Sequence, residues 1–281
     1  IPEPTLMNLS ILKNKLTILY LIIGTFLAFS QGTLMRIQAD RTIEITEGST
    51  ATYIDGQLNL YFVNKDEISK QSSYSTPIKQ SLKQWQTIDD IETISTLKVS
   101  VFSKSQQQIC FLDNTLSANG NCINLDDLGL FNVGAIAASK RPDMLWLYDE
   151  LNSSLILFNF ISKKEIQKVD NLQGILGISG EITLNENESG LWIGSSDGKI
   201  CLMDDFMNVV RCVSETNQAM IPFADGFFFV NENILYYHDL FEGVNEVHKI
   251  STTENIRELY ISGNQLIVRT SSKLNVFIIQ P

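Results

Sequence analysis

Histidine and proline are scarce in this sequence, and the residue patterns that usually mark a catalytic or cofactor site are missing. Only two histidines and six prolines occur among 281 residues. The one Gly-x-Ser-x-Gly match, Gly194–Gly198, lies between the two strands of a predicted hairpin and not before a helix, so we interpret it as a turn and not as a nucleophile elbow. No phosphate-binding loop or dinucleotide glycine motif follows a predicted strand, and no His or Cys pair has zinc-ligand spacing. We therefore expect a protein that is not an enzyme, with no catalytic residue, no cofactor and no metal site.

Positive charge is also in short supply. The sequence has 21 Lys and Arg residues against 32 Asp and Glu residues, which gives a formal net charge of -11. Because the basic residues are scattered, the protein should repel a phosphate backbone at long range. We expect no nucleic-acid partner, whereas the hydrophobic content of 44% is enough for a large folded core.

The sequence has one long apolar run, and it lies near the N-terminus. Leu16–Phe29 follows two lysines and precedes a small, polar exit that ends at Gly32. This arrangement, with Met7 as the expected start, predicts a secretory signal peptide over residues 1–31. The run is shorter than the roughly 20 residues of a membrane-spanning helix, so a retained anchor is the less favoured alternative. Residues 32–281 are then a single exported domain.

Helical periodicity is almost absent, and short apolar runs separated by turn residues take its place. The clearest unit runs from Gly190 to Asp204, where Leu191–Ile193 and Lys199–Met203 flank a turn that ends at Gly198. Apolar runs of this length around a turn with Gly and Asp are typical of a β-hairpin. Comparable hairpins recur along most of the chain, which favours an all-β repeat fold.

The hairpins repeat at a nearly constant spacing. One equivalent strand residue can be chosen in each unit: Leu60, Val101, Trp146, Trp192, Phe228 and Ile267. Their mean step of about 41 residues matches the roughly 40 to 45 residues of a four-stranded propeller blade. We predict a β-propeller of six four-stranded blades, in which Thr33–Ile45 completes the last blade and closes the ring.

Two alternatives to this architecture remain open at the level of the sequence. A seventh blade would need strands within the polar stretch Lys65–Gln84, which we otherwise expect to hold one outer strand and a long loop. A pair of two-sheet sandwiches would show a similar spacing between strands, but it would not require the constant unit length.

Four cysteines fall into two similarly placed pairs. Cys110 and Cys201 each lie in the second strand of a hairpin, and Cys122 and Cys212 lie where the next antiparallel strand should return. The sequence therefore predicts the disulfides Cys110–Cys122 and Cys201–Cys212, which agree with an oxidising compartment. Four buried thiols that fill positions in the sheets are the alternative.

Few other residues are candidates for a functional site. Trp85 lies in a polar stretch outside the apolar strands, where it either contacts a partner or packs under its own loop. His238 follows an apolar strand and is expected in a surface turn. The pairs Asp89-Asp90, Asp126-Asp127 and Asp204-Asp205 lie beside predicted turns, where Asp caps backbone amides.

Several strand segments also resemble known propellers. Gly190–Ile200 is similar to the repeat of two-component-regulator sensor propellers. Leu97–Phe102, Ile109–Leu116 and Met144–Asp149 resemble a family of exported Bacteroidota propellers that includes the plug subunit of the type IX secretion translocon. The second resemblance implies a periplasmic, non-enzymatic protein that binds an outer-membrane complex. It assigns no site residue in this chain.

The sequence thus predicts a periplasmic propeller that binds a protein of the cell envelope and meets the membrane only through its signal segment or its partner. Two alternative functions make different structural predictions. A ligand-sensing or carbohydrate-sensing propeller would line one mouth of its channel with aromatic side chains. A hydrolase or lyase would gather several carboxylates there, as a glycosidase does.

Overall fold

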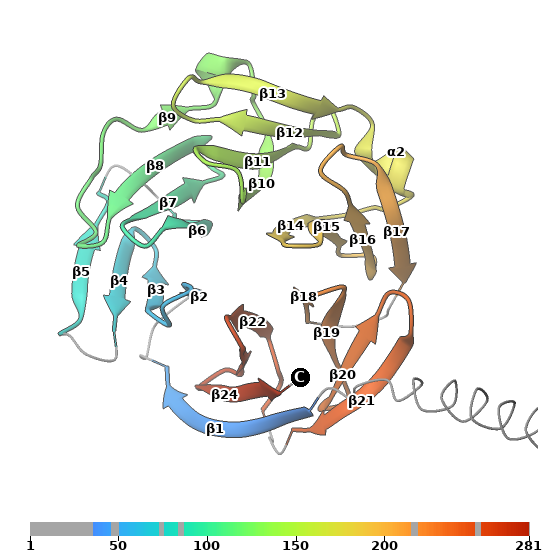
Figure 1. The fold of residues 1–281 in the computed structure, drawn as a ribbon. Helices are drawn as coiled ribbons and strands as arrows, with labels where there is room; N and C mark the ends of the chain where they lie inside the picture. The colour runs from blue at the N-terminus through green and yellow to red at the C-terminus, as the bar shows by residue number, and fades with distance from the viewer. Residues whose placement is uncertain are drawn as a thin grey trace, which may run out of the picture.

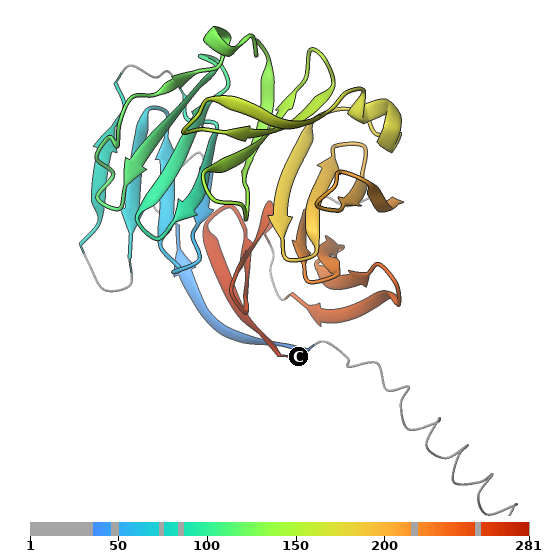
Figure 2. The ribbon, with the colours of Figure 1, turned by 45° about the horizontal axis from the view of Figure 1, so that its top comes forward.

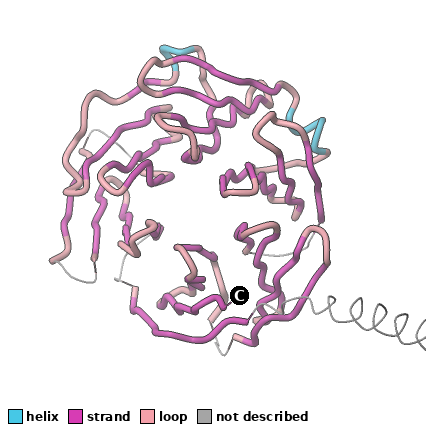
Figure 3. The backbone as a smooth tube through the Cα atoms, in the orientation of Figure 1, coloured by secondary structure: helices cyan, strands magenta, loops and turns pink. Residues whose placement is uncertain are grey.

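The structure, a computed structural model, is a ring of six four-stranded antiparallel sheets, as the repeat spacing predicts (Figure 1). It describes residues 36–45, 51–72, 76–83, 87–214, 219–250 and 254–280. The predicted signal peptide and Trp85 lie outside these ranges. Each sheet is one propeller blade, and one edge strand of every sheet faces the ring axis (Figure 3).

The first three blades follow one another in the chain, each from its inner to its outer strand. Blade 1 consists of β2 (Ala51–Ile54), β3 (Leu60–Asn64), β4 (Glu67–Gln71) and β5 (Ile78–Ser81). Blade 2 consists of β6 (Asp90–Ser95), β7 (Lys98–Ser103), β8 (Gln108–Asp113) and β9 (Ile123–Asn124). Blade 3 consists of β10 (Val133–Ala138), β11 (Met144–Asp149), β12 (Ser154–Asn159) and β13 (Lys164–Val169).

Blades 4 and 5 repeat the same order. Blade 4 consists of β14 (Ile182–Asn187), β15 (Gly190–Ser195), β16 (Lys199–Met203) and β17 (Val209–Ser214). Blade 5 consists of β18 (Met220–Phe223), β19 (Gly226–Asn231), β20 (Ile234–Asp239) and β21 (Gly243–Lys249). A 3-10 helix, Asp126–Leu128, links blades 2 and 3, and α2 (Leu172–Leu176) links blades 3 and 4. No helix among the described residues has the length and apolar character needed to cross a membrane.

Blade 6 joins the two ends of the described chain and closes the ring. Its inner strands are β22 (Glu258–Ser262), β23 (Gln265–Arg269) and β24 (Lys273–Gln280), and its outer strand is β1 (Arg36–Glu44). β1 runs antiparallel to β24 along its whole length (Figures 1 and 2). The prediction that the first strand completes the last blade is therefore confirmed.

Each pair of neighbouring blades shares an apolar cluster, which explains why the units assemble into a ring. Tyr61 of blade 1 packs in one cluster with Val101 of blade 2. Between blades 4 and 5, the rings of Trp192 and Phe227 lie 6.3 Å apart. Burial of one such side chain contributes about 1.5–3 kcal/mol, and a single hairpin cannot bury its own apolar face. Trp146 and Trp192 are both buried, as their matched strand positions predict.

Glycine permits close contacts between strands within the blades. Gly198 has a φ of 88° in the turn between β15 and β16, where the sequence requires a positive φ. Gly190 begins β15 with a φ of 138°, and a Cβ atom there would lie 2.2 Å from the carbonyl oxygen of Met203. A larger residue at Gly190 would push β15 away from β16.

The expectation for the polar stretch Lys65–Gln84 is wrong in one respect. The stretch holds two strands, β4 and β5, which complete blade 1 and leave no seventh blade in this part of the chain. Ile68 of β4 is fully buried, whereas Lys79 and Gln80 of β5 are exposed. β5 has a weak apolar pattern because it is an outer strand that no further strand covers.

Both predicted disulfides form. One joins Cys110 to Cys122 in blade 2, and the other joins Cys201 to Cys212 in blade 4. Cys201 and Cys212 are directly opposite residues of β16 and β17. Each bridge ties the third strand of its blade to the chain that returns beside it, and therefore closes only a short loop.

Candidate functional site

The turns of the blades lie on two opposite faces of the ring, because every blade is antiparallel. One face carries the turns between second and third strands and the segments that connect successive blades, and we call it the connector face. The other carries the turns between first and second strands and between third and fourth strands, and we call it the corner face. The two faces differ in the side chains that they present.

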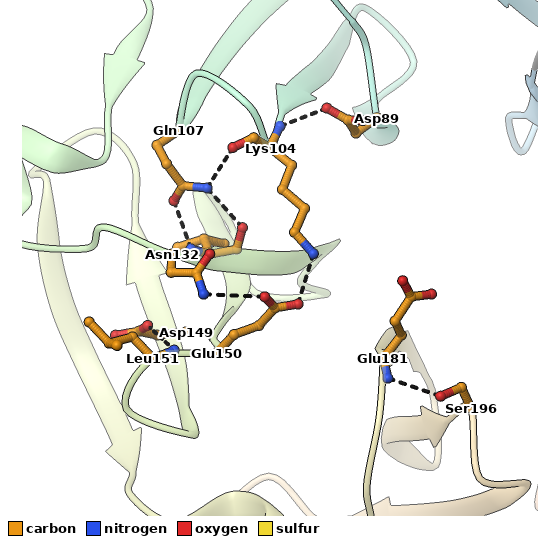
Figure 4. Close-up of polar contacts among 10 residues, drawn as sticks. Asp89, Lys104, Gln107, Asn132, Asp149, Glu150, Leu151, Glu181 and Ser196 are labelled. Carbon is orange, nitrogen blue, oxygen red and sulfur yellow. Dashed lines mark hydrogen bonds and ion pairs between the residues drawn. The ribbon is translucent and has the colours of Figure 1, made fainter.

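On the connector face, polar side chains of blades 2 and 3 form a network around Lys104 (Figure 4). The Lys104 ammonium lies 2.8 Å from Oε1 of Glu150, and Asn132 donates a hydrogen bond of 3.3 Å to Oε2 of the same carboxylate. The backbone N–H of Lys104 donates to Oδ2 of Asp89 at 2.7 Å. Both carboxylates thereby hold turns in place.

Gln107 links this network to the backbone of blade 3 (Figure 4). Its amide nitrogen donates to the carbonyl oxygens of Lys104 at 2.8 Å and of Val133 at 3.1 Å, and its oxygen accepts from the N–H of Val133 at 2.7 Å. The side chain is buried. All three partners are main-chain groups. The Gln107 side chain therefore bonds to the backbone at the start of β10 as a neighbouring strand would.

Carboxylates therefore gather near one mouth of the ring, as the hydrolase or lyase alternative requires. Glu181 of blade 4 also directs its carboxylate away from its strand there, while its N–H donates to Oγ of Ser196 at 3.0 Å (Figure 4). However, Asp89 and Glu150 already have backbone, amide or lysine partners. Among the described residues, no group of three or more His, Cys, Asp or Glu side chains is arranged to hold a metal ion.

Two carboxylates on β6 have strongly raised pKa values. Asp90 and Glu92 are partly buried and lie on the same face of the strand. Burial raises the pKa of Asp90 to about 7, and burial followed by the charge of Asp90 raises the pKa of Glu92 to about 8. Oε2 of Glu92 accepts a hydrogen bond of 3.0 Å from the N–H of Ala138, which ties β6 to β10. Our sequence reasoning missed Glu92, although the two-residue period of a strand places it beside Asp90.

Tyrosines and an ion pair continue this polar lining in blades 1 and 6. The Tyr53 hydroxyl donates to the carbonyl oxygen of Asp89 at 2.7 Å, and the Tyr260 hydroxyl bonds to Glu258. Nη1 of Arg269 lies 2.6 Å from Oε2 of Glu258. Burial raises the pKa of both tyrosines well above the ordinary value, so the phenols remain protonated donors. These contacts join β2 to the segment that leads into β6, and β22 to β23.

A cavity of ≈ 580 Å³ lies beside the inner strands of blades 4, 5 and 6, and β22 contributes Glu258 and Leu259 to its lining. β14 contributes Thr183 and Asn185 to its lining, and β18 contributes Met220 and Pro222. This volume falls within the range of small-molecule sites. Its only described aromatic lining residue, Trp192, is almost fully buried between the blades. Among the described residues that line this cavity there is therefore no exposed aromatic side chain of the kind that the ligand-sensing or carbohydrate-sensing alternative predicts.

The corner face repeats one turn in four successive blades. An Asp or Asn at the end of the third strand accepts, through Oδ1, a hydrogen bond from the N–H two residues later. The donor and acceptor are 2.8 Å apart at Asp113, 3.1 Å at Asn159, 2.9 Å at Asp204 and 2.8 Å at Asp239. This Asx turn fixes the backbone of the corner and directs the second following side chain outward.

Three of these corners present a large apolar side chain to solvent. Ile161 of blade 3 is 64% exposed, Phe206 of blade 4 is 80% exposed and Phe241 of blade 5 is 68% exposed. The equivalent residue of blade 2 is Thr115. The connector face exposes large apolar residues too, but they come from segments that are not equivalent. Our sequence reasoning recognised these turns and missed their apolar tips, although each tip stands two residues after a strand-ending Asp or Asn.

His238 differs from its predicted environment. It lies within β20 and is partly buried, and its ring stacks on Phe227 with centroids 5.1 Å apart. It is therefore a strand residue and not a surface-turn residue. The strand pairing extends to Asp239, and the turn follows at Leu240.

No protein-family model matches the chain, and no curated protein matches it in sequence. Solved structures that share its fold include the WD40 domain of Neurospora crassa Pan2, with a TM-score of 0.55 and 6% identity over 88% of this chain and 96% of that one. The β-propeller domain of Cps50 (Swd1) from Myceliophteria thermophila has a TM-score of 0.57 and 11% identity over 87% of this chain and 100% of that one.

A third similar structure is the virginiamycin B lyase of Staphylococcus aureus. It has a TM-score of 0.58 and 8% identity, and the match covers 87% of this chain and 99% of the lyase. At identities this low the likeness defines the fold class, a β-propeller, and no more. Because the similar structures include a lyase as well as a WD40 domain, they do not decide between an enzyme and a binding protein.

Proposed function

We propose that the protein is an exported, non-enzymatic β-propeller that binds a protein partner of the cell envelope through its corner face. The observation that carries the proposal is the exposure of Ile161, Phe206 and Phe241 at equivalent corners of three successive blades. Exposed apolar groups that recur on one face are typical of interaction surfaces. The propeller is also a fold typical of protein-interaction scaffolds.

Several features support export. Two disulfides are suited to an oxidising compartment, and residues 1–31 have the pattern of a signal peptide. We place the protein in the periplasm, beside an outer-membrane complex. A role in a secretion complex, which the resemblance to the Bacteroidota family implies, is the most specific form of this proposal.

The polar groups near the ring axis support a non-enzymatic function. Asp89, Glu92 and Glu258 all engage backbone or arginine donors within the ring. Catalytic carboxylates of a hydrolase need room for substrate or water between them. The contacts of these carboxylates fit a structural role better.

The test is affinity purification of the tagged, chromosomally expressed protein from detergent-solubilised envelopes, followed by mass spectrometry. We expect a near-stoichiometric envelope protein with the unmodified chain, and its loss when Ile161, Phe206 and Phe241 are all changed to Ser. The matched control changes Phe131 and Leu151 of the connector face, which are 61% and 67% exposed, to Ser. Recovery of a free monomer from unmodified cells would contradict the proposal and would favour the ≈ 580 Å³ cavity as a small-molecule site.

A further inference from the structure

We infer that the corner face of blades 4 and 5 binds a polypeptide segment of the partner that combines basic and apolar side chains. This inference rests on the proposed function and specifies the chemistry of the partner. It is carried by the charges that surround Phe206 and Phe241, which the other exposed corner, Ile161 in blade 3, does not share to the same extent.

The turns that carry the two phenylalanines, and the turns between the first and second strands of the same blades, are rich in carboxylates. The four corner-face turns of blades 4 and 5 carry five acidic residues, Glu188, Asp204, Asp205, Asp225 and Glu242, and Asp239 ends the strand before the last of these turns. Hydrogen bonds from Asn208 and from the backbone lower the pKa of Asp204, so this carboxylate is ionised at neutral pH. The surface around Phe206 and Phe241 is therefore strongly negative.

The same four turns contain no basic residue. Two basic residues of blade 3 contact these turns, and both bind the same acidic residue, Asp205. Nζ of Lys140 lies 2.9 Å from Oδ1 of Asp205, and Nη2 of Arg141 donates to the carbonyl oxygen of Asp205 at 2.7 Å. The charge of the patch is thus only partly balanced, and an incoming segment with Lys or Arg side chains would complete the balance.

The patch is held in one conformation before any partner binds. Oδ1 of Asp204 accepts the N–H groups of Phe206 at 2.9 Å and of Asn208 at 2.8 Å. Between the blades, Oγ of Ser189 donates to Oδ1 of Asp225 at 2.6 Å. Little conformational entropy would therefore be lost in ordering these turns when a partner binds. This low cost favours tight recognition by a few anchor residues.

Other occupants fit the patch less well. A second copy of this chain has a net charge of -11, and a symmetric contact would place acidic turns against acidic turns. A membrane surface with anionic lipids would be repelled by the same carboxylates. A basic and apolar segment of another protein satisfies both the phenylalanines and the charges around them.

The first test places a photoreactive amino acid in the full-length chain at Phe206, at Phe241 and, as a control, at Leu151 of the connector face. Each variant is expressed in the native cells, irradiated, and its cross-linked peptides are sequenced by mass spectrometry. We expect Phe206 and Phe241 to cross-link the same segment of one protein, with Lys or Arg within a few residues of apolar side chains. Leu151 should not reach that segment.

The outcomes separate this inference from the proposed function. If cross-links form only from Leu151, the protein binds a partner through the connector face, so the inference and the corner-face part of the proposed function are both wrong, while export and protein binding survive. Cross-links to a second copy, to lipid, or to an acidic or uncharged segment would also overturn the inference. If no position cross-links any protein and the purification recovers none, both proposals fail.

The second test isolates the charge. Glu242 and Glu232 are exposed residues of the same blade, on the corner and connector faces respectively, so Glu242→Lys and Glu232→Lys change the net charge equally. With a synthetic peptide of the cross-linked segment as the probe, we expect Glu242→Lys to weaken binding roughly tenfold at low salt and less at high salt. Glu232→Lys should bind like the unmodified protein. Equal effects of the two variants would contradict the inference.

Discussion

The inner strands and the corner face differ in the side chains that they carry and in how far these are paired or exposed. Near the ring axis, polar groups are numerous and many have backbone or oppositely charged partners, as Glu92 and Glu258 illustrate, and the buried Gln107 of the connector face bonds to the backbone in the same way. On the corner face, Phe206 and Phe241 are exposed although the turns beneath them are tightly hydrogen-bonded. Paired polar groups are expected of a scaffold, whereas rigid exposed aromatic groups are expected of a binding surface. We therefore expect changes near the ring axis to affect the free energy of unfolding and changes on the corner face to affect partner binding.

The largest effect is expected at the two phenylalanines. The double variant Phe206→Ser and Phe241→Ser should weaken partner binding by about 3 kcal/mol, or more than roughly 100-fold, because both anchors are lost. Unfolding in urea should change little, since the side chains have few contacts within the ring. Calorimetry with the purified partner measures the first effect, and circular dichroism measures the second. A stability loss as large as the binding loss would mean that these residues belong to the scaffold.

The opposite behaviour is expected at Gln107. Gln107→Ala removes three hydrogen bonds and leaves the N–H and carbonyl of Val133 without these partners in a buried setting. We expect a loss of about 2–3 kcal/mol in the free energy of unfolding. The fraction that stays folded should bind the partner normally. Gln107→Glu is a useful companion, because it keeps the acceptor for Val133 but loses the donor.

The sequence predicts the ring better than it predicts either region. Blade spacing, ring closure by β1 and both disulfides follow from local patterns, because each depends on a repeated apolar hairpin. Within Lys65–Gln84 the sequence predicts one strand where the structure has two, because the exposed residues of β5 are polar and give no apolar pattern. The sequence does not reveal Glu92, because its raised pKa depends on burial and on the charge of Asp90. Both depend on how the inner strands are arranged in space. The exposure of Phe206 and Phe241 on one face likewise depends on two turns that are distant in sequence.

A smaller effect, dependent on pH, is expected at Glu92. Its pKa is raised from 4.5 to about 8, so between these values the folded protein holds a proton that the unfolded chain has lost. Stability should therefore fall as the pH rises through this interval. Glu92→Gln keeps an acceptor for the N–H of Ala138 and cannot ionise.

The comparison at Glu92 is made by urea unfolding at two pH values. We expect the Glu92→Gln variant to match the unmodified protein near about pH 5 and to be more stable by about 1–2 kcal/mol near about pH 8.5, which is less than the full pKa difference implies because Glu92 is only partly buried and solvent screens its charge. Partner binding should be unaffected at either pH. If the variant is less stable at both pH values, the carboxyl group contributes more as an acceptor than it loses by burial.

The smallest effect is expected at the corner turns, and it tests whether their rigidity serves binding. Asp204→Ala removes the cap beneath Phe206, and Asp113→Ala removes the same cap beneath Thr115. Both changes should lower the melting temperature slightly and by similar amounts, because both corners are exposed and similarly bonded. Only Asp204→Ala should also weaken partner binding, by roughly threefold, since Phe206 then has to be ordered on binding.

Asp204→Asn, which keeps an acceptor but removes the charge, separates the contribution of turn geometry from that of charge. Retained affinity would point to turn geometry, and reduced affinity would point to attraction between the corner carboxylate and a basic partner. If Asp113→Ala weakens binding as much as Asp204→Ala does, the interface reaches blade 2 and is not centred on the two phenylalanines.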